Sequence, residues 1–505
     1  MPRPKTETTR ANKTAQSFKL SAKLSSKFWV VLPMALLLSA AACSREQVSI
    51  PSDSNQAGIT ALAPIAGHLL VADQGGQPLA QAKVMIGARE NVPFPGNVLT
   101  TDADGKVALP AQWTDAQPIT VEVAGFVRAT WMNQAPQALA LQVRRKIQAQ
   151  RMELKGKATG FKNLKQDGWV DVGVIFPALR KDQLASLQVT DLVSPEVDTI
   201  TIMGQSINIP SNVSLPKQQE RYFFTITLDK PVFRSYLPEP RTWKMVAAHA
   251  RFPFEEVVDD LRAGKSFFDV LNYFEFKSAT IKDIALSSPS TNQDLSITDT
   301  VFDAKVDVTA PRFASSQTML AVSVAENGGL LYPTDVKKLG PSETRRLVSP
   351  KGVPGYLVGA LRDTNAPSSG AGADAMSVVI SPNTGTTKFE FLDIAKAPTA
   401  RGSTLGLNPP KSSVASVTPA ATYATLNKID RVTSGSMQID RKSPVWDVYA
   451  TGWSASMELP EMGSAISGSH RWEVLFGAAT QGTNVSLSPS IIDGLSHVSK
   501  SAVDL

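Results

Sequence analysis

Short runs of alternating apolar and polar residues follow one another after residue 62. They lie at residues 67–71, 81–86, 98–101, 106–109, 119–123 and 138–143, and Gly, Asp and Pro separate them. A period of two turns one face of each run toward a core, and regular turn signals between such runs are typical of an antiparallel sandwich. The pattern therefore predicts a β-sandwich over residues 63–146.

A second β-rich region, residues 147–310, is predicted to contain two short helices. Its candidate strands are residues 169–176, 199–203, 206–209, 222–228 and 244–251. Between Phe252 and Phe274, apolar residues recur at helical spacing on both sides of Ala263 and Gly264. The second helix is expected to begin at Ser266, since serine is a favoured N-cap residue.

The remaining residues, 311–505, predict a third, sandwich-like β domain. Its candidate strands are residues 318–325, 355–361, 376–380, 389–392, 445–459 and 470–476. The last two runs are expected to pair. The proline-rich stretch 397–420 is predicted to be a long loop or internal linker. The fold class expected for the chain is therefore mainly β and multidomain, with an Ig-like or prealbumin-like sandwich first.

The N-terminal 42 residues have the pattern of a signal peptide. Lys23 and Lys27 precede an apolar run that begins at Phe28 and ends at Leu38, and small residues follow as far as Cys43. A basic segment, a short apolar core and small residues before a cleavage site are the three parts of a secretory leader. Residues 1–42 are therefore expected to be removed, and residues 43–62, which are polar and small, to form a flexible tether.

The run Leu38-Ser39-Ala40-Ala41-Ala42-Cys43 resembles a bacterial lipobox, although the family prefers Leu at the position of Ala40. The resemblance implies that the Cys43 thiol receives diacylglycerol and that several acyl chains anchor the protein stably to a membrane. Ser44, rather than Asp, follows the cysteine, which by the family's sorting rule favours the outer membrane. The face of that membrane stays open, as does the alternative of an ordinary signal peptide with an incidental Cys43.

Charge and cysteine content narrow the function classes further. The formal net charge is +6, and residues 1–43 contribute seven basic residues (Arg3, Lys5, Arg10, Lys13, Lys19, Lys23, Lys27) and the acid Glu7. The rest of the chain holds 44 basic and 44 acidic residues (51 − 7 and 45 − 1). A neutral mature chain has no overall field to attract a polyanion, so no nucleic-acid partner is expected. A single cysteine excludes an intramolecular disulfide and a thiolate metal cluster.

The first sandwich resembles the carboxypeptidase regulatory-like, or prealbumin-like, family. The resemblance is carried by Gly67-His68-Leu69, Pro78-Leu79, Ala82-Lys83-Val84, Thr101-Asp102-Ala103-Asp104-Gly105-Lys106-Val107 and Gly125-Phe126. The family accompanies enzymes, transporters and adhesins and has no catalytic groups of its own. Asp102 and Asp104 are interpreted as turn residues rather than calcium ligands, because the other ligands of a calcium loop are missing. Gly105 is expected to supply the positive φ that closes the hairpin.

Candidate chemistry elsewhere is sparse. His68, His249, His470 and His497 are far apart in sequence, and the chain has no HExxH pair, nucleophile elbow, P-loop or dinucleotide fingerprint. We therefore expect no metal and no cofactor. Alternation places several tryptophans toward a core, which is the favoured interpretation for each of them; Trp131 and Trp453 are the least securely buried and are the candidates for stacking on a sugar.

Three hypotheses follow. The first is a non-enzymatic lipoprotein of the cell envelope with a binding, structural or adhesive role toward a protein or glycan. The second is a surface hydrolase acting on glycan or peptide, with its site in residues 149–505. The third is a small-molecule or glycan-binding lipoprotein associated with a transporter.

Overall fold

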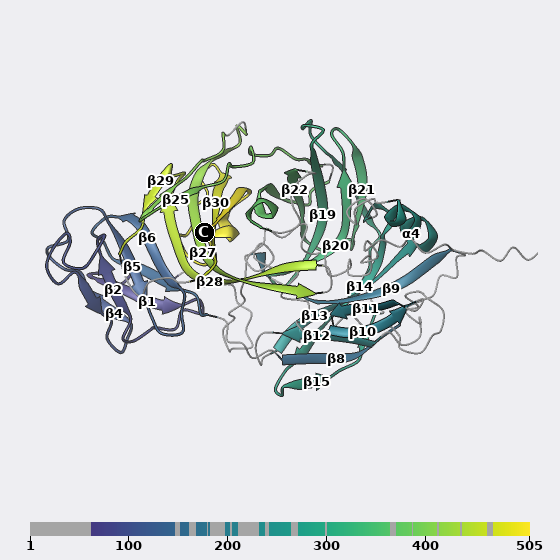
Figure 1. The fold of residues 1–505 in the computed structure, drawn as a ribbon, viewed down its shortest axis with the longest axis horizontal. Coiled ribbons are helices and arrows are strands. Elements are labelled where there is room, and N and C mark those ends of the chain that lie inside the picture. The colour runs from purple at the N-terminus through teal and green to yellow at the C-terminus, as the bar shows by residue number, and fades with distance from the viewer. Residues whose placement is uncertain are drawn as a thin grey trace, which may run out of the picture.

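The computed structural model describes the chain from residue 62 onward, with gaps. The described residues are 62–146, 152–160, 168–178, 180–181, 197–202, 205–210, 232–237, 242–263, 271–297, 300–363, 370–385, 387–411, 414–434, 437–461 and 468–505. Cys43 and the predicted leader lie outside them. Strands dominate the described residues and helices are few (Figure 1), which confirms the mainly β, multi-sheet fold. None of the helices in these ranges has the length and apolar character of a membrane span.

The N-terminal sandwich consists of two sheets. One has the order β4-β1-β7, and the other contains β3, β2, β5 and β6. Their bounds are β1 His68–Asp73, β2 Lys83–Ile86, β3 Val98–Thr100, β4 Lys106–Ala108, β5 Gln117–Glu122, β6 Arg128–Gln134 and β7 Leu139–Val143. Leu69, Val84, Ile119 and Leu141 are buried between the sheets, as the alternation in each run predicts.

A twelve-stranded sheet runs through the N-terminal sandwich and the C-terminal part of the chain. Its order is β20-β19-β22-β23-β31-β30-β27-β28-β6-β5-β2-β3. The C-terminal strands are β19 Gln317–Asn327, β20 Leu330–Leu339, β22 Gly355–Asp363, β23 Met376–Pro382, β27 Val417–Ser434, β28 Met437–Thr451, β30 His470–Thr480 and β31 His497–Asp504. β28 and β6 pair in parallel. Through this pairing, β6, β5, β2 and β3 of the N-terminal sandwich continue the large sheet. The predicted domains 63–146 and 311–505 therefore share one sheet.

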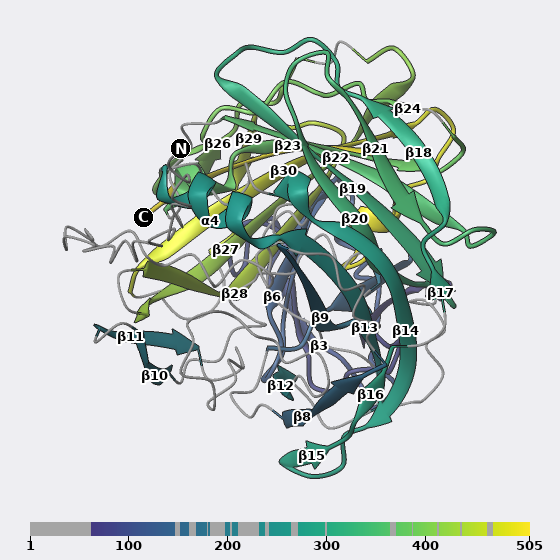
Figure 2. The same ribbon diagram turned by 90° about the vertical axis from the view of Figure 1, so that its right-hand side faces the viewer.

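The middle region contains three sheets and a helix, and its smallest sheet is the antiparallel pair β10-β11. Another sheet has the order β17-β14-β13-β9, and in the third β8 pairs with β12, β15 and β16. The bounds are β8 Met152–Thr159, β9 Trp169–Pro177, β10 Val197–Ile202, β11 Gln205–Pro210, β12 Val232–Leu237, β13 Thr242–Pro253, β14 Glu275–Ala285, β15 Ser290–Asn292, β16 Leu295–Ser296, β17 Thr300–Val301 and α4 Phe254–Arg262, with a 3-10 helix at Leu271–Tyr273. Figure 2 shows these sheets below β19 and β22.

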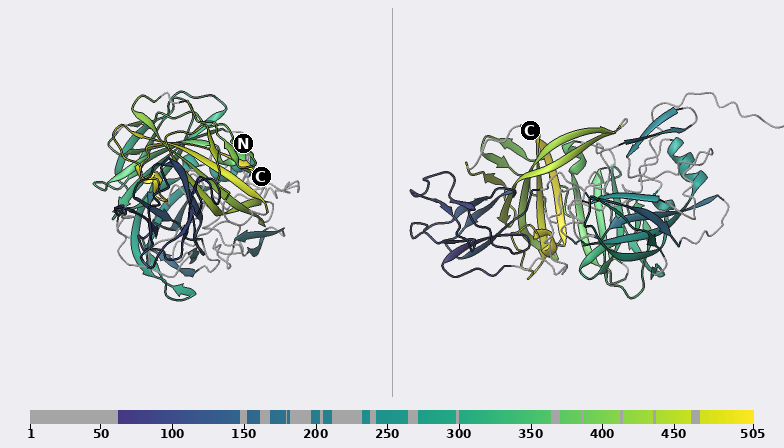
Figure 3. Two further views of the ribbon diagram at one scale, coloured as in Figure 1. Left: turned by 90° about the vertical axis from the view of Figure 1, so that its left-hand side faces the viewer. Right: turned by 90° about the horizontal axis from the view of Figure 1, so that it is seen from below.

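Two small sheets complete the described fold. β18 Ala304–Thr309 pairs with β21 Thr344–Ser349 and β24 Thr387–Lys388, and β26 Thr404–Gly406 pairs with β25 Thr399–Arg401 and β29 Ser456–Glu458. Two 3-10 helices lie at Ala371–Asp374 and Ile491–Gly494. β18 precedes residue 311 and pairs with strands after it, and the domain limits stay a prediction. The N-terminal sandwich and the middle region lie at opposite ends of the molecule, with the curved large sheet between them (Figure 3).

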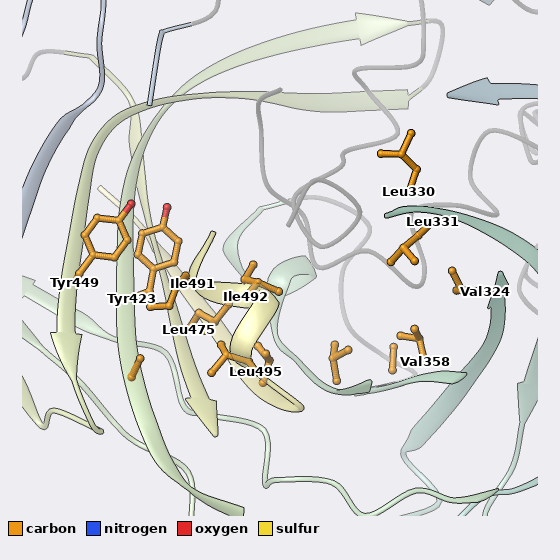
Figure 4. Close-up of a cluster of buried hydrophobic side chains, with 14 of the residues drawn as sticks. Val324, Leu330, Leu331, Val358, Tyr423, Tyr449, Leu475, Ile491, Ile492 and Leu495 are labelled. Carbon is orange, nitrogen blue, oxygen red and sulfur yellow. The ribbon is translucent and has the colours of Figure 1, made fainter. Parts of the chain in front are cut away.

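One end of the inner, concave face of the twelve-stranded sheet is lined by apolar side chains. Figure 4 shows Tyr423, Tyr449 and Leu475 on one wall of the curve and Val324 and Val358 on the opposite wall. These side chains belong to one buried apolar cluster, which also includes residues of β13 and β14. The curve therefore brings strands that are distant in sequence around a shared interior.

Several predictions from the sequence differ from the observed strands. β6 was not predicted, although Arg128-Ala129-Thr130-Trp131 alternates polar and apolar residues; the structure buries all four. Residues 389–392 form no strand, although Phe389 is buried. The stretch 397–420 is not one loop: it contains β25, β26 and the start of β27. Pro419 is tolerated in β27 because the register shifts there, as at a bulge.

The last two runs do not pair with each other, because β27 lies between β28 and β30. Trp446 and Trp472 both lie opposite Leu426 of β27, so they share one face of the sheet. The first predicted helix is present as α4, whereas Ser266, the predicted start of the second, lies outside the described residues.

Candidate functional site

A network of buried ion pairs occupies the end of the inner face beyond the apolar cluster. Lys442 Nζ lies 2.7 Å from Asp374 Oδ1 and 2.5 Å from Glu473 Oε1. Lys500 Nζ lies 2.9 Å from Glu473 Oε2, and Arg471 Nη1 lies 3.2 Å from Asp374 Oδ2. These five side chains are 6% exposed or less. Charges so deep in a protein are stable only when they are paired.

The strand order explains how these five residues meet. Lys442 lies on β28, Arg471 and Glu473 on β30, Lys500 on β31, and Asp374 ends the 3-10 helix before β23. Arg471 and Glu473 alternate with Trp472 and Val474, so one face of β30 is charged and the opposite face belongs to an apolar cluster. The network therefore ties three strands and the approach to a fourth into one layer.

Neighbouring carboxylates change the pKa values of the cations Lys442 and Arg362. Burial by itself would lower the pKa of Lys442, but the carboxylates of Asp374 and Glu473 outweigh it and raise that pKa above its ordinary value. Arg362 on β22 differs, because burial dominates over Asp374 and Asp363 and lowers its pKa. The carboxylates therefore outweigh burial at Lys442, whereas burial outweighs them at Arg362.

A second buried ion pair joins the N-terminal sandwich to the large sheet. Arg144, just after β7, donates from Nε to Asp447 Oδ2 at 2.9 Å and from Nη2 to Oδ1 at 2.7 Å. The hydroxyls of Tyr423 and Thr425 donate to the same Oδ1 at 2.9 and 2.7 Å. Although burial alone would lower the pKa of Arg144, the charge of Asp447 raises it above its ordinary value. The junction is thus fixed by a bidentate pair as well as by strand pairing.

The structure buries Trp131, one of the two candidates for stacking on a sugar. Its side chain is 2% exposed, its Nε1 donates to the Leu487 carbonyl at 2.6 Å, and its ring stacks on Tyr449 at 5.6 Å between centroids. The reason is β6, which places Trp131 opposite Tyr449 in the junction. This ring is therefore part of the junction and presents no free stacking surface.

Trp453 is half-buried. Its Nε1 donates to the Gly477 carbonyl at 2.8 Å, and its ring meets Phe476 edge-on at 6.3 Å. It also packs against the apolar clusters on the outer face of the sheet. The structure does not bring Trp131 and Trp453 together, because they contact opposite faces of the large sheet.

The Asp102 turn is held by its own carboxylate. Asp102 Oδ1 accepts from the Asp104 and Lys106 amides at 2.9 and 2.8 Å. Gly105 has φ +70°, and a Cβ there would lie 2.5 Å from the Val71 carbonyl oxygen. Within the described ranges, no group of three or more His, Cys, Asp or Glu side chains could hold a metal ion.

The four histidines are dispersed. His68 Nδ1 lies 2.9 Å from the Ala66 carbonyl, His470 Nδ1 lies 2.8 Å from the Gly468 carbonyl, and His497 Nδ1 lies 2.9 Å from Ser496 Oγ. His249 differs, because its Nε2 lies 2.7 Å from Asp171 Oδ1 and both side chains are buried. Sequence spacing could not indicate this pair, since β9 and β13 bring together residues 78 positions apart.

Sequence reasoning also missed the ion-pair network. The available signal was the alternation in residues 470–476, which puts Arg471 and Glu473 on one face. A strand face that carries charged residues normally indicates contact with solvent. Recognising it as buried requires knowing that β31 and the segment around Asp374 lie next to it.

Comparisons with known proteins identify no family. No family model and no curated protein match the chain. Among solved structures, the major pilin subunit BcpA of Bacillus cereus is 11% identical over 64% of this chain and 97% of its own, with a TM-score of 0.14. A putative adhesin of Bacteroides ovatus is 12% identical over 43% and 72%, with a TM-score of 0.12. The Bacillus anthracis TIE protein is 9% identical over 78% and 60%, with a TM-score of 0.11. Scores this low carry no argument about this chain.

Proposed function

We propose that this chain is a non-enzymatic lipoprotein of the bacterial cell envelope, with a binding or structural role toward a protein or glycan. The observation that carries the proposal is the continuous twelve-stranded sheet. The sandwich is joined through β6 to β28 and by the buried pair of Arg144 and Asp447, so it forms one continuous platform with the large sheet. A continuous platform suits a component that bridges or supports a partner at a surface.

Membrane attachment is the part of the proposal that rests on the sequence. The run Leu38–Cys43 resembles a lipobox, Cys43 is the single cysteine, and the chain after it is formally neutral. Attachment through several acyl chains would place the platform at the membrane without any spanning segment. Ser44 favours the outer membrane by the sorting rule of that family.

Cys43→Ser is expected to abolish lipid attachment. Cells fed an alkyne analogue of palmitate should label the wild-type protein and leave the variant unlabelled, and the wild type alone should fractionate with outer membranes. Ser44→Asp is the matched control, because it keeps the thiol: it should stay labelled and move to the inner membrane. Labelling of Cys43→Ser equal to wild type would refute the anchor.

One observation favours the rival hypothesis of a surface hydrolase. His249 of β13 contacts Asp171 of β9, and Ser278 of β14 lies directly opposite His249 in the sheet. Directly opposed residues in antiparallel strands point to the same face, with Cβ atoms about 4.5–5.5 Å apart. Serine, histidine and aspartate on three neighbouring strands are the residue types of a nucleophilic triad.

The rival is tested by turnover. If the triad were functional, the purified protein would hydrolyse members of an ester, peptide or polysaccharide panel, and Ser278→Ala would lose about 10³-fold or more in rate. We expect no turnover above the Ser278→Ala background. Hydrolysis by the wild type that Ser278→Ala removes would overturn the non-enzymatic proposal.

A further inference from the structure

Three side chains of the ion-pair network place an amine between two carboxylates. Lys442 Nζ lies 2.7 Å from Asp374 Oδ1 and 2.5 Å from Glu473 Oε1. All three side chains are 6% exposed or less, so solvent has little access to these contacts. An amine, a carboxylate and a second carboxylate held in fixed contact are the groups that can form an amide bond and move the protons involved.

The network stays paired if one cation and one acid are removed from it. Lys500 Nζ lies 2.9 Å from Glu473 Oε2, and Arg471 Nε lies 2.6 Å from Asp504 Oδ1. Both contacts persist when the remaining amine and carboxylate are converted to a neutral amide. A buried charge carries a larger desolvation cost than a buried amide. The conversion therefore relieves part of the cost of burying the network.

We propose that Lys442 and Asp374 are joined by an intramolecular isopeptide bond, and that Glu473 transfers a proton in the step that forms it. Glu473 accepts one proton from the ammonium, and the resulting amine attacks Cγ of Asp374. The Nζ–Cγ bond forms and the Cγ–Oδ1 bond breaks. Oδ1 leaves as water, with one proton returned by Glu473 and one from the attacking nitrogen. Nothing is oxidised or reduced, and the net charge is unchanged.

Glu473 is needed because the amine starts in its protonated form. The two carboxylates raise the pKa of Lys442 above its ordinary value despite burial. The ammonium must therefore lose a proton before the nitrogen can attack. Glu473 Oε1 lies within hydrogen-bond reach of that nitrogen, which is the geometric requirement for a general base.

Two contacts assign Asp374, and not Glu473, as the acceptor of the new bond. Arg471 Nη1 donates to Asp374 Oδ2 at 3.2 Å, so the guanidinium stabilises the negative charge that develops on Oδ2 during attack. Glu473 also pairs with Lys500, and this pair would be lost if Glu473 were the acceptor. Lys500 is the poorer nucleophile, because its Nζ lies 3.8 Å from Asp374 Oδ1.

The bond joins parts of the large sheet that are not neighbours. Lys442 lies on β28, and Asp374 ends the 3-10 helix before β23. β31, β30 and β27 lie between β23 and β28. A covalent link across them closes a loop of the chain and restricts its unfolded state, as a disulfide does. The inference goes beyond the proposed binding role and is independent of the partner, because the step needs no substrate.

Peptide mapping of the full-length wild-type lipoprotein tests the bond. Trypsin does not cleave after an acylated lysine, so residues 442–471 should stay in one peptide and be linked to residues 363–388. Mass spectrometry should find these two peptides joined in most molecules, with the mass of one water missing. Free peptide 363–388, together with cleavage after Lys442 in most molecules, would overturn the inference.

Fragmentation of the linked peptides identifies the two ends of the bond. A link from Lys442 to residues 472–500, which contain Glu473, would overturn the assignment of the acceptor. A link from Lys500 to residues 363–388 would overturn the assignment of the nucleophile. Loss of ammonia in place of water would identify an amide as the acceptor, such as the buried Asn427 on the neighbouring strand β27, and would also overturn the inference.

Two variants separate the bond from the ion pairs. Lys442→Arg keeps a cation beside both carboxylates, and it should give no linked peptide. Glu473→Gln keeps the shape of the side chain but takes up no proton, so the linked fraction of freshly purified protein should fall about tenfold or more. A linked fraction in Glu473→Gln equal to wild type would overturn the role of Glu473.

A more exposed pair in the same digest is the matched control. Lys244 Nζ lies 2.9 and 3.2 Å from the carboxylate oxygens of Asp283 on the neighbouring strand. These side chains are 22% and 57% exposed, so water solvates both groups and no linked peptide is expected. A link between Lys244 and Asp283 at the wild-type yield of the buried bond would mean that contact alone produces linkage during handling, and would overturn the inference.

Discussion

Asp447→Ala is expected to lower the free energy of unfolding by about 3–5 kcal/mol, the typical cost of removing one partner of a buried ion pair. The variant leaves the Arg144 guanidinium buried without its carboxylate and takes an acceptor from the hydroxyls of Tyr423 and Thr425. Because Arg144 belongs to the N-terminal sandwich, the loss should also weaken the junction at β6 and β28. Urea unfolding followed by tryptophan fluorescence measures the change.

The control for Asp447 is a similar pair on the surface. Asp307 also binds an arginine through two nitrogens, Arg346 Nε at 2.7 Å and Nη2 at 3.2 Å, but both side chains are exposed. Asp307→Ala should leave the unfolding midpoint nearly unchanged, because exposed pairs contribute little. Equal midpoints for Asp447→Ala and wild type would mean that the junction does not contribute to stability.

Glu473→Ala is expected to have an effect of similar size, about 3–5 kcal/mol. Its carboxylate contacts both Lys442 and Lys500, and all three side chains are buried. Without it, the contacts with Asp374 stay in place, at 2.7 Å from Lys442 Nζ and 3.8 Å from Lys500 Nζ. Urea unfolding should show a lower midpoint, and Glu473→Gln should recover part of the loss, because the amide keeps the shape and one acceptor.

The control for Glu473 lies on the same sheet. Asp430 contacts Lys428 at 3.2 Å, and both side chains are exposed. Asp430→Ala should unfold close to wild type. A midpoint for Glu473→Ala that matches Asp430→Ala would contradict the assignment of the network as a buried, mutually dependent set of charges.

Local alternation was sufficient to predict some of the strands, whereas long strands such as β14, β20, β27 and β31 were not predicted. The runs at 67–71, 81–86 and 119–123 are strands within one or two residues, because each is a short run with apolar residues between turn signals. The helix at 254–262 followed from helical spacing. In these cases, the chain near each residue contains the whole signal.

The candidate site could not be predicted in the same way. The junction buries both faces of the first half of β6, and Trp131 meets Tyr449 only through the non-local pairing of β6 with β28, which no local pattern indicates. The charged face of β30 has the pattern of a solvent face, and β31 and Asp374 cover it only after non-local pairing.

Hydrogen–deuterium exchange on the wild-type protein tests most directly whether the first sandwich and the C-terminal strands form one sheet. The parallel ladder pairs Trp446–Tyr449 with Arg128–Trp131, so peptides from both segments should be protected as strongly as peptides from β30 in the middle of the sheet. In Asp447→Ala, these two segments should lose protection before β30 does. Exchange of residues 128–131 in the wild type at the rate of an exposed loop would contradict the shared sheet.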